Sequence, residues 1–306
     1  MNNITLEITS TVAELDGGEK KLADFAAACS CCGFAPAVQL HNTVSEKAIN
    51  KIIDCGLPMS AHAPVMGDYS LNLATEKHLD IIFDMFELNA DFMRKYSVTR
   101  GVFHGFSMCD ELIPRMRTQE DYKVTLRKSC PPELLLEDTW LNTNYTHLNE
   151  YKTRRTILKN NLAELRKRFP DLLFCIENDM PVYGYSNMKL EQMRDLEHPI
   201  CIDTGHLWAA SLLLDFDFFE DLEYGLKNLD VRMVHLHNSF MTHSTPKTQI
   251  QDGHQRLIAP SEMDWRAALV LMLKYQISDF VLEIGSADAD DVYAFAEVYR
   301  NAEKSF

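Results

Sequence analysis

Short apolar runs of strand length recur along the whole chain, and most of them end in a residue that can bind a metal. The runs cover residues 4–8, 37–41, 59–62, 101–104, 172–177, 201–203, 231–237 and 280–283. Amphipathic segments of helix length separate nearly all of them, as at 20–32, where Leu22, Phe25 and Cys29 share one helical face. Strict alternation of strands and helices over about 250 to 300 residues predicts an α/β fold, a single (β/α)8 TIM barrel with its helices outside.

Further helices are predicted at 45–55, 75–96 and 148–169, because each segment repeats apolar residues at helical spacing. Gly33 follows the helix at 20–32, as expected for a C-cap. The stretch 201–206 is the centre of the pattern, since a buried strand there runs into the turn Asp203-Thr204-Gly205-His206. A carboxylate and an imidazole three residues apart at such a strand end can converge on one cation.

The carboxyl ends of the strands share one mouth in a TIM barrel, so residues far apart in sequence become neighbours there. The candidate metal ligands at or just beyond these ends are His62, His104, Glu177, Asp203, His206, His235, Asp252, His254 and Glu283. Glu177 and Glu283 each end an apolar run, and a buried carboxylate is costly unless it is paired, so we expect a metal as the partner. His41 is expected to be a hydrogen-bonded wall residue, and alternation places His237 on the same face as His235.

The alternation stops between residues 106 and 147, and such a long irregular segment is usually functional or disordered. It holds Trp140 and Tyr145, several prolines, and the basic residues Arg115, Arg117, Arg127 and Lys128. We interpret it as a lid-like insertion after the fourth strand, in which Trp140 binds substrate and the basic residues clamp a phosphate. A solvated helical insertion explains the same residues equally well.

Composition and net charge limit the number of domains, the kind of partner and the compartment that we expect. With 306 residues and 46% hydrophobic content, residues 1–306 are expected to form one domain, since no linker or repeat divides them. The net charge of −15 disfavours nucleic acid as a partner, because such binding relies on clustered Lys and Arg. The absence of a signal peptide or membrane-length run predicts a soluble cytoplasmic protein with reduced cysteines, and Cys29, Cys31 and Cys32 lack zinc-ribbon spacing.

In aggregate, these motifs resemble the xylose isomerase-like TIM barrel superfamily, which includes sugar and sugar-phosphate isomerases and epimerases, inosose dehydratases and apurinic endonucleases. The resemblance spans roughly residues 60 to 285, whereas the first two strands and the insertion match nothing diagnostic. The motifs are Ala61-His62-Ala63-Pro64, Val102-Phe103-His104, Ile176-Glu177-Asn178, Asp203-Thr204-Gly205-His206, His235-Leu236-His237-Asn238, Asp252-Gly253-His254 with Met263-Asp264-Trp265, and Leu282-Glu283-Ile284.

The resemblance implies that Glu177, Asp203, His235 and Glu283 hold one divalent metal, which would be Mn, Zn, Mg or Co, as in the isomerases and epimerases. There the metal polarises a sugar carbonyl and stabilises an enediolate, while the two glutamates move the proton on opposite faces. We therefore expect a metal-dependent isomerase or epimerase of a small-molecule sugar or sugar phosphate. His206, His237 and Trp140 are the candidate substrate-binding residues. The oligomeric state stays open, and a homo-oligomer is possible.

The same resemblance leaves a second function open. The apurinic endonucleases use nine positions to hold three zinc ions, so the ligand set would also include His62, His104, His206, Asp252 and His254, all present here. The chain would then be a multi-zinc phosphoesterase. The charge of −15 and the missing aromatic wedge after His62 speak against a DNA substrate. A lyase-type reaction is a third alternative, and metal content, from one to three ions per chain, separates the first two.

Overall fold

The protein is described by a computed structural model that covers residues 3–115, 124, 127, 130–137, 139–143, 145–182 and 184–304. Each strand pairs in parallel with the next along the chain, and β8 closes onto β1. The strands are β1 (Thr5–Thr9), β2 (Ala35–Leu40), β3 (Met59–His62), β4 (Arg100–Phe103), β5 (Leu173–Glu177), β6 (Ile200–Asp203), β7 (Val231–Leu236) and β8 (Asp279–Leu282). The predicted TIM barrel is confirmed, and every strand lies within two residues of its expected bounds.

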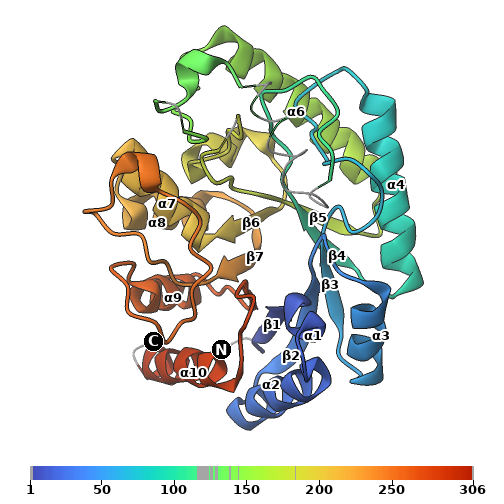
Figure 1. Ribbon diagram of the computed structural model, residues 1–306, viewed down its shortest axis with the longest axis vertical. Helices are drawn as coiled ribbons and strands as arrows, with labels where there is room; N and C mark the ends of the chain where they lie inside the picture. The colour runs from blue at the N-terminus through green and yellow to red at the C-terminus, as the bar shows by residue number, and fades with distance from the viewer. Residues whose placement is uncertain are drawn as a thin grey trace.

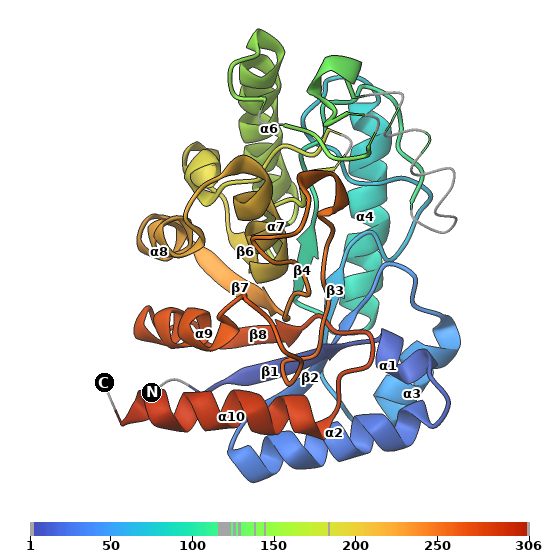
Figure 2. The ribbon, with the colours of Figure 1, turned by 60° about the vertical axis from the view of Figure 1, so that its left-hand side comes forward.

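Helices surround the barrel, as two views of the ribbon show (Figures 1 and 2). They are α1 (Thr11–Glu14), α2 (Gly18–Cys32), α3 (Glu46–Asp54), α4 (Leu79–Lys95), α6 (Asn149–Arg168), α7 (Thr204–Leu214), α8 (Phe218–Asn228), α9 (Trp265–Lys274) and α10 (Ala289–Glu303). Short 3-10 helices lie at Pro132–Leu134, Leu190–Leu196 and Lys247–Gln249. Gly33 caps α2 in the left-handed conformation, as predicted, with φ of 82°.

The predicted helix at 75–96 begins only at Leu79. The Thr75 hydroxyl instead donates to Asp110 Oδ1 at 2.7 Å and accepts from the backbone N–H of Lys77 at 3.1 Å. Such local side-chain bonds compete with helix formation. His78 then adopts a left-handed conformation, with φ of 55°, directly before the helix. Apolar spacing could not locate this start, because the interruption is made by polar residues.

The expected turn at 203–206 is instead the first turn of helix α7. Asp203 is its N-cap, since Oδ1 accepts from the backbone N–H of His206 at 2.6 Å. Nearly every residue of α7 is buried, so the segment lacks the polar face that marks an amphipathic helix in sequence. The consequence for the mouth is rigidity, because Asp203 and His206 are held by a strand end and a helix start rather than by a loop.

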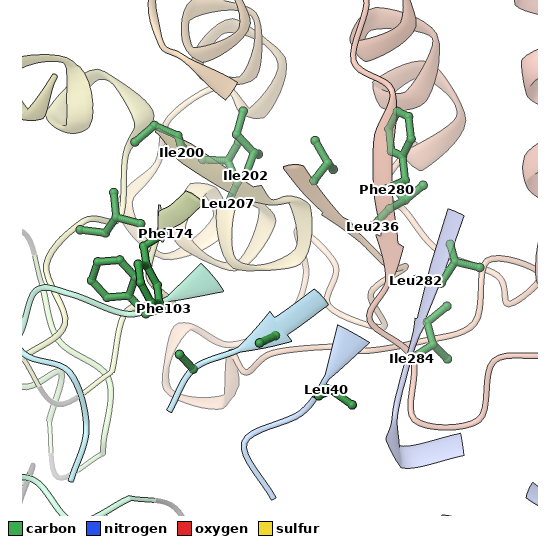
Figure 3. Packing of buried hydrophobic residues seen from close by; sticks show 14 of the residues in the cluster. Leu40, Phe103, Phe174, Ile200, Ile202, Leu207, Leu236, Phe280, Leu282 and Ile284 are labelled. Carbon is green, nitrogen blue, oxygen red and sulfur yellow. The ribbon is translucent and has the colours of Figure 1, made fainter. Parts of the chain in front are cut away.

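The main core lies between the barrel and its helices. Side chains such as Phe103, Phe174 and Phe280 belong to this layer, and Figure 3 shows them on strands around the barrel. Phe86 of α4 contacts the rings of Phe103 and Phe174 edge to face, with centroids 5.1 and 5.4 Å apart. Because strand side chains alternate, these outward residues leave every second position for the barrel interior.

The barrel interior is layered along its axis. Near the amino ends of the strands, the Arg100 guanidinium pairs with Glu7, at 2.5 Å, and with Asp279. Two residues further along the strands lies an apolar layer of Val102, Cys175, Cys201, Met233 and Val281. These layers fill the lower barrel, so the candidate ligands at the carboxyl ends face one open side.

The cysteines were predicted to be reduced, and the chain was predicted to lack a membrane-spanning helix. All eight cysteines lie in the described part of the chain and are free thiols. Cys29 is buried and Cys31 is exposed, so their thiols lie in different environments. Burial raises the pKa of Cys201 to about 12, although nearby His235 opposes this shift, and the thiol behaves as a small apolar residue. Within the described ranges, no helix combines the length and apolar character needed to cross a membrane.

Candidate active site at the barrel mouth

Four candidate ligands converge inside the mouth, where each offers one ligand atom within 4.8 Å of the others: Glu177, Asp203, His235 and Glu283. His235 Nδ1 lies at their centre, 2.8 Å from Glu177 Oε1, 3.0 Å from Glu283 Oε2 and 3.6 Å from Asp203 Oδ2. Three of the residues are fully buried, and Glu283 is slightly exposed. One imidazole and three carboxylates form a donor set that suits Zn²⁺, Mn²⁺ and similar cations.

The hydrogen bonding of this four-residue site fits a cation. Glu177 Oε2, Asp203 Oδ2 and Glu283 Oε2 are buried and accept no well-formed hydrogen bond from the described residues. Three carboxylates this close carry more negative charge than one imidazole neutralises, and buried unpaired charge is costly. A divalent cation would satisfy both the orphaned oxygen atoms and the excess charge.

Backbone contacts fix the spacing between two of these ligands. The Asn178 side chain donates to the Asp203 carbonyl oxygen at 3.0 Å and accepts from the Asp203 N–H at 2.7 Å. Asp203 Oδ1 is engaged in capping α7, which leaves Oδ2 on the side of His235. Asn178 therefore links the end of β5, which carries Glu177, to the end of β6, which carries Asp203.

His62 and His104 lie beside Glu177. Their Nε2 atoms are 3.2 and 3.5 Å from Glu177 Oε2, and His62, Glu177 and His235 form a further set that can hold an ion. Asp179, which was not among the predicted site residues, accepts from His104 Nδ1 at 3.0 Å. A carboxylate only accepts, so in the neutral ring the His104 Nε2 lone pair faces Glu177. Carboxylates in this position orient metal-binding histidines.

His206, Asp252 and His254 form a neighbouring cluster. Asp252 Oδ2 lies 3.2 Å from His206 Nε2 and 2.5 Å from His254 Nε2. Both rings donate their Nδ1–H to backbone carbonyl oxygens, His206 to Asn178 at 2.9 Å and His254 to Glu283 at 2.8 Å. The structure thus brings all nine predicted ligands together at one end of the barrel.

The carboxylates and imidazoles of the mouth polarise one another. Burial raises the pKa of Glu177 and Asp203, but the surrounding imidazoles outweigh it and hold both well below their usual range. In the opposite sense, burial lowers the pKa of His254, and Asp252 outweighs it, raising this pKa to about 10. A proton on one of these imidazoles occupies the ring nitrogen that would otherwise bind a cation. Protons and a cation therefore compete for these nitrogen atoms.

A cavity of about 300 Å³ opens over these residues. Its polar lining includes His62, His104, His206, Asp252, His254 and Glu283, and its apolar lining includes Pro64, Leu71, Trp140, Met180 and Val182. The volume is at the lower end of the range for small-molecule sites. His41 lines the cavity, bonds Thr43 Oγ1 through Nδ1 at 2.8 Å, and has its pKa lowered by burial to about 4.

No protein-family model and no curated protein matches the chain. Solved structures match it over nearly its whole length. A D-tagatose 3-epimerase-like protein gives a TM-score of 0.59 at 14% identity, covering 99% of this chain and 98% of that one. A xylose isomerase domain protein from Planctomyces limnophilus gives 0.56 at 12% identity, covering 100% and 99%. This chain has the xylose isomerase-like TIM-barrel fold.

A third structure with this fold is the 3-keto-D-glucoside 4-epimerase from E. coli, with a TM-score of 0.53 at 12% identity, covering 99% of this chain and 100% of that one. At such low identity, the likeness establishes the fold and leaves the activity of this chain to its own residues. The fold expected from the resemblance is confirmed.

In this xylose isomerase-like barrel, the insertion at 106–147 contributes Arg115 and Trp140 to the cavity lining. Single bridges from Ser107 to Tyr185 and from Leu141 to Val182 join it to the segment after β5. Arg127 is exposed and does not line the cavity, so it does not support the predicted phosphate clamp. Arg117 and Lys128 of that prediction lie outside the described residues.

His237, a predicted substrate contact, lies next to the cavity-lining residue Asp252. It is fully buried and is not among the described residues that line the cavity. Its ring fits against Gly205, where an added Cβ would lie 1.9 Å from His237 Cε1. The predicted contact of His237 with substrate stays a prediction.

Proposed function

We propose that this protein is a divalent-metal-dependent isomerase or epimerase of a small sugar or sugar phosphate. The observation that carries the proposal is the convergence of Glu177, Asp203, His235 and Glu283 beside a cavity of about 300 Å³. The names of two matching structures, a D-tagatose 3-epimerase-like protein and a 3-keto-D-glucoside 4-epimerase, agree with this chemistry.

The two glutamates carry the proton transfer in this proposal. Glu177, Asp203, His235 and Glu283 would hold a divalent cation, which would supply a Lewis acid for a ketose carbonyl. Glu283 lines the cavity at the end of β8 and takes the proton from the carbon beside that carbonyl, which gives an enediolate. Glu177 ends β5, three strands away in the barrel, and lies directly behind the cavity-lining His62 and His104. In this proposal it serves the other side of the sugar. Return of a proton to the opposite face inverts the carbon, and return to the neighbouring carbon isomerises the sugar.

The cavity lining positions the sugar for this transfer. His62 and His206 present ring nitrogen atoms beside Glu177 and Asp252, within reach of sugar hydroxyl groups. Trp140, Met180 and Val182 cover one side with apolar surface, which excludes water from a reactive enediolate and contacts the carbon face of a sugar. Specificity then depends on this apolar side as well as on the polar ligands.

A phosphoesterase with several metal ions is the second candidate. It is favoured by one observation, that His62 forms another possible ion site with Glu177 and His235, which also belong to the four-residue site. Extra cations would hold the charge that develops on a phosphoester. The size of the cavity and the net charge of −15 favour a small substrate over nucleic acid.

The experiment that tests the proposal restores one divalent metal at a time to chelator-treated protein. The protein is then incubated with aldoses and ketoses, with and without phosphate, and the products are separated by chromatography. We expect an epimer or isomer that forms only with metal and is not formed by Glu283→Gln. Cleavage of a phosphoester without any sugar product would replace this proposal with the second candidate.

A further inference from the structure

We propose that the substrate is a disaccharide, whose reacting unit lies in the cavity and whose second, neutral sugar ring lies in an adjacent groove of about 580 Å³. Trp140 lines both the cavity and the groove. The groove lining also includes Thr245, Gln249, Ile250 and Gln251, which all belong to the segment after β7. The inference rests on the proposed function, because it names the substrate class of the same site.

The groove adjoins the cavity along the chain as well as at Trp140. Gln251 lines the groove, and the next residue, Asp252, lines the cavity. A molecule that extends out of the cavity past these residues therefore enters the groove directly. The cavity itself is at the lower end of the volume range for small-molecule sites. We therefore assign one sugar unit to the cavity and a second one to the groove.

Core packing holds both walls of the groove in place. Trp140 and Ile250 pack into one hydrophobic cluster, which also includes Leu141, Met180 and Val182. Ile250 is only 1% exposed, and a bridge between Leu141 and Val182 joins the insertion to the segment after β5. The groove is therefore formed before any ligand binds, as is usual for small-molecule sites.

The groove suits an uncharged ligand. No charged side chain is among the described residues that line it. Lys247 lies close to Gln249 in sequence, but its ammonium group donates to Asp215 and to the Leu213 carbonyl oxygen, the latter at 3.0 Å. A phosphate or carboxylate would call for Arg or Lys in the lining. The part of the substrate that lies here is therefore neutral.

The side chains of the groove favour a sugar over a purely apolar group. Gln249 and Gln251 are both exposed, and they flank the buried Ile250, which anchors them at the groove. A glutamine amide both donates and accepts hydrogen bonds, as a sugar hydroxyl group does. Trp140 adds aromatic surface for the carbon–hydrogen face of a ring. This combination of an indole with two amides matches a sugar ring.

The test compares the affinity of metal-loaded protein for D-fructose with its affinity for turanose, isomaltulose and lactulose. Each of these disaccharides links a neutral hexose to fructose at a different position, and isothermal titration calorimetry gives the dissociation constants. We expect at least one disaccharide to bind roughly tenfold more tightly than fructose. The double variant Gln249→Ala/Gln251→Ala should lose this advantage. Asn50→Ala is the control, because it removes an exposed amide from α3, outside the cavity and the groove.

Failure of every disaccharide to bind more tightly than fructose overturns the proposal, and this result needs no variant to fold. So does a double variant that is folded by circular dichroism and keeps the full advantage. Fructose 6-phosphate tests the charge assignment, which is wrong if the phosphate gains affinity that the double variant removes. Because the readout is binding, a protein that prefers disaccharides but converts none refutes only the proposed function. An active epimerase that binds fructose and the disaccharides alike refutes only the groove.

Discussion

Asp179 accepts a hydrogen bond from His104 Nδ1 at 3.0 Å, and the same ring presents Nε2 to Glu177 Oε2 at 3.5 Å. Asp179 is itself held, since its Oδ2 accepts from the backbone N–H of Asn187 at 3.1 Å. It is fully buried and does not line the cavity. We therefore regard Asp179 as a positioning residue that acts on the metal centre through His104.

Asp179→Asn should weaken metal binding by roughly 10- to 100-fold, the range typical of residues that orient metal ligands. An amide can donate to His104 Nδ1 and so turn the ring hydrogen towards Glu177. Competition with a chromophoric chelator measures the affinity. Asp221→Asn is the control, because Asp221 is a buried carboxylate that accepts from the backbone N–H groups of Leu190 and Glu191 outside the cavity. Equal metal affinity in all three proteins would remove the role assigned to Asp179.

Glu283→Gln should lower metal affinity by at least the same 10- to 100-fold, because it removes one charged ligand of four. The amide keeps the shape of the side chain, so folding should be preserved. Glu7→Gln is the matched control, since Glu7 is a buried glutamate on the neighbouring strand β1 that pairs with Arg100 at the opposite end of the barrel. Unchanged metal content in Glu283→Gln would contradict the four-residue site.

Trp140→Ala tests whether the insertion selects the substrate. Loss of an aromatic contact is worth about 1 kcal/mol, so KM should rise by several-fold to about tenfold while kcat changes little. Phe240→Ala is the control, because Phe240 is exposed near Trp140 but does not line the cavity. Steady-state kinetics on the identified sugar provide the readout. An unaltered KM and unaltered specificity in Trp140→Ala would make this part of the insertion structural only.

The barrel could be predicted from sequence because its strands combine an apolar run with a metal-capable residue at one end. This local pattern correctly predicted the strand ends at which Glu177, Asp203 and Glu283 lie. Helix α7 escaped the same reasoning, since a helix buried on all sides has no polar face to reveal its period. The late start of α4 escaped it because Thr75 is held by Asp110, a residue far away in sequence.

The ligands of the mouth were predictable individually, but their surroundings were not. Asp179 follows Glu177 by two residues, and this spacing was the available signal, yet its contact with His104 depends on the pairing of β4 with β5. Strand alternation placed His237 beside His235 in the mouth. It could not show that Gly205 lets the His237 ring fit behind the cavity rather than line it.

His198 should make folding stability depend on pH. Burial and the Arg166 guanidinium lower its pKa to about 3, whereas an unfolded histidine titrates near 6.5. Below about pH 6.5 the unfolded chain binds a proton that the folded chain does not, so the contribution is fully present above that pH and is lost as pH falls towards 3. The loss from this residue is about 1.4 kcal/mol per pH unit.

Urea denaturation of chelator-treated protein between about pH 4 and 6.5 measures this slope. His198→Asn should flatten it by about one proton relative to wild type, although the variant is less stable at neutral pH because it loses two hydrogen bonds. The difference between the two slopes is what counts, since other histidines contribute equally to both proteins. Identical slopes would contradict the assignment of His198 as a neutral, buried imidazole.

We propose that Glu177 and Glu283 move a carbon-bound proton of a sugar, and hydrogen exchange in heavy water tests this role most directly. Metal-loaded protein incubated with a panel of ketoses should place deuterium at the carbon beside the carbonyl, as followed by NMR. Glu177→Gln and Glu283→Gln should abolish this exchange, and His104→Ala should reduce it less. Absence of exchange across the panel, with phosphoester cleavage at full metal loading, would contradict the account.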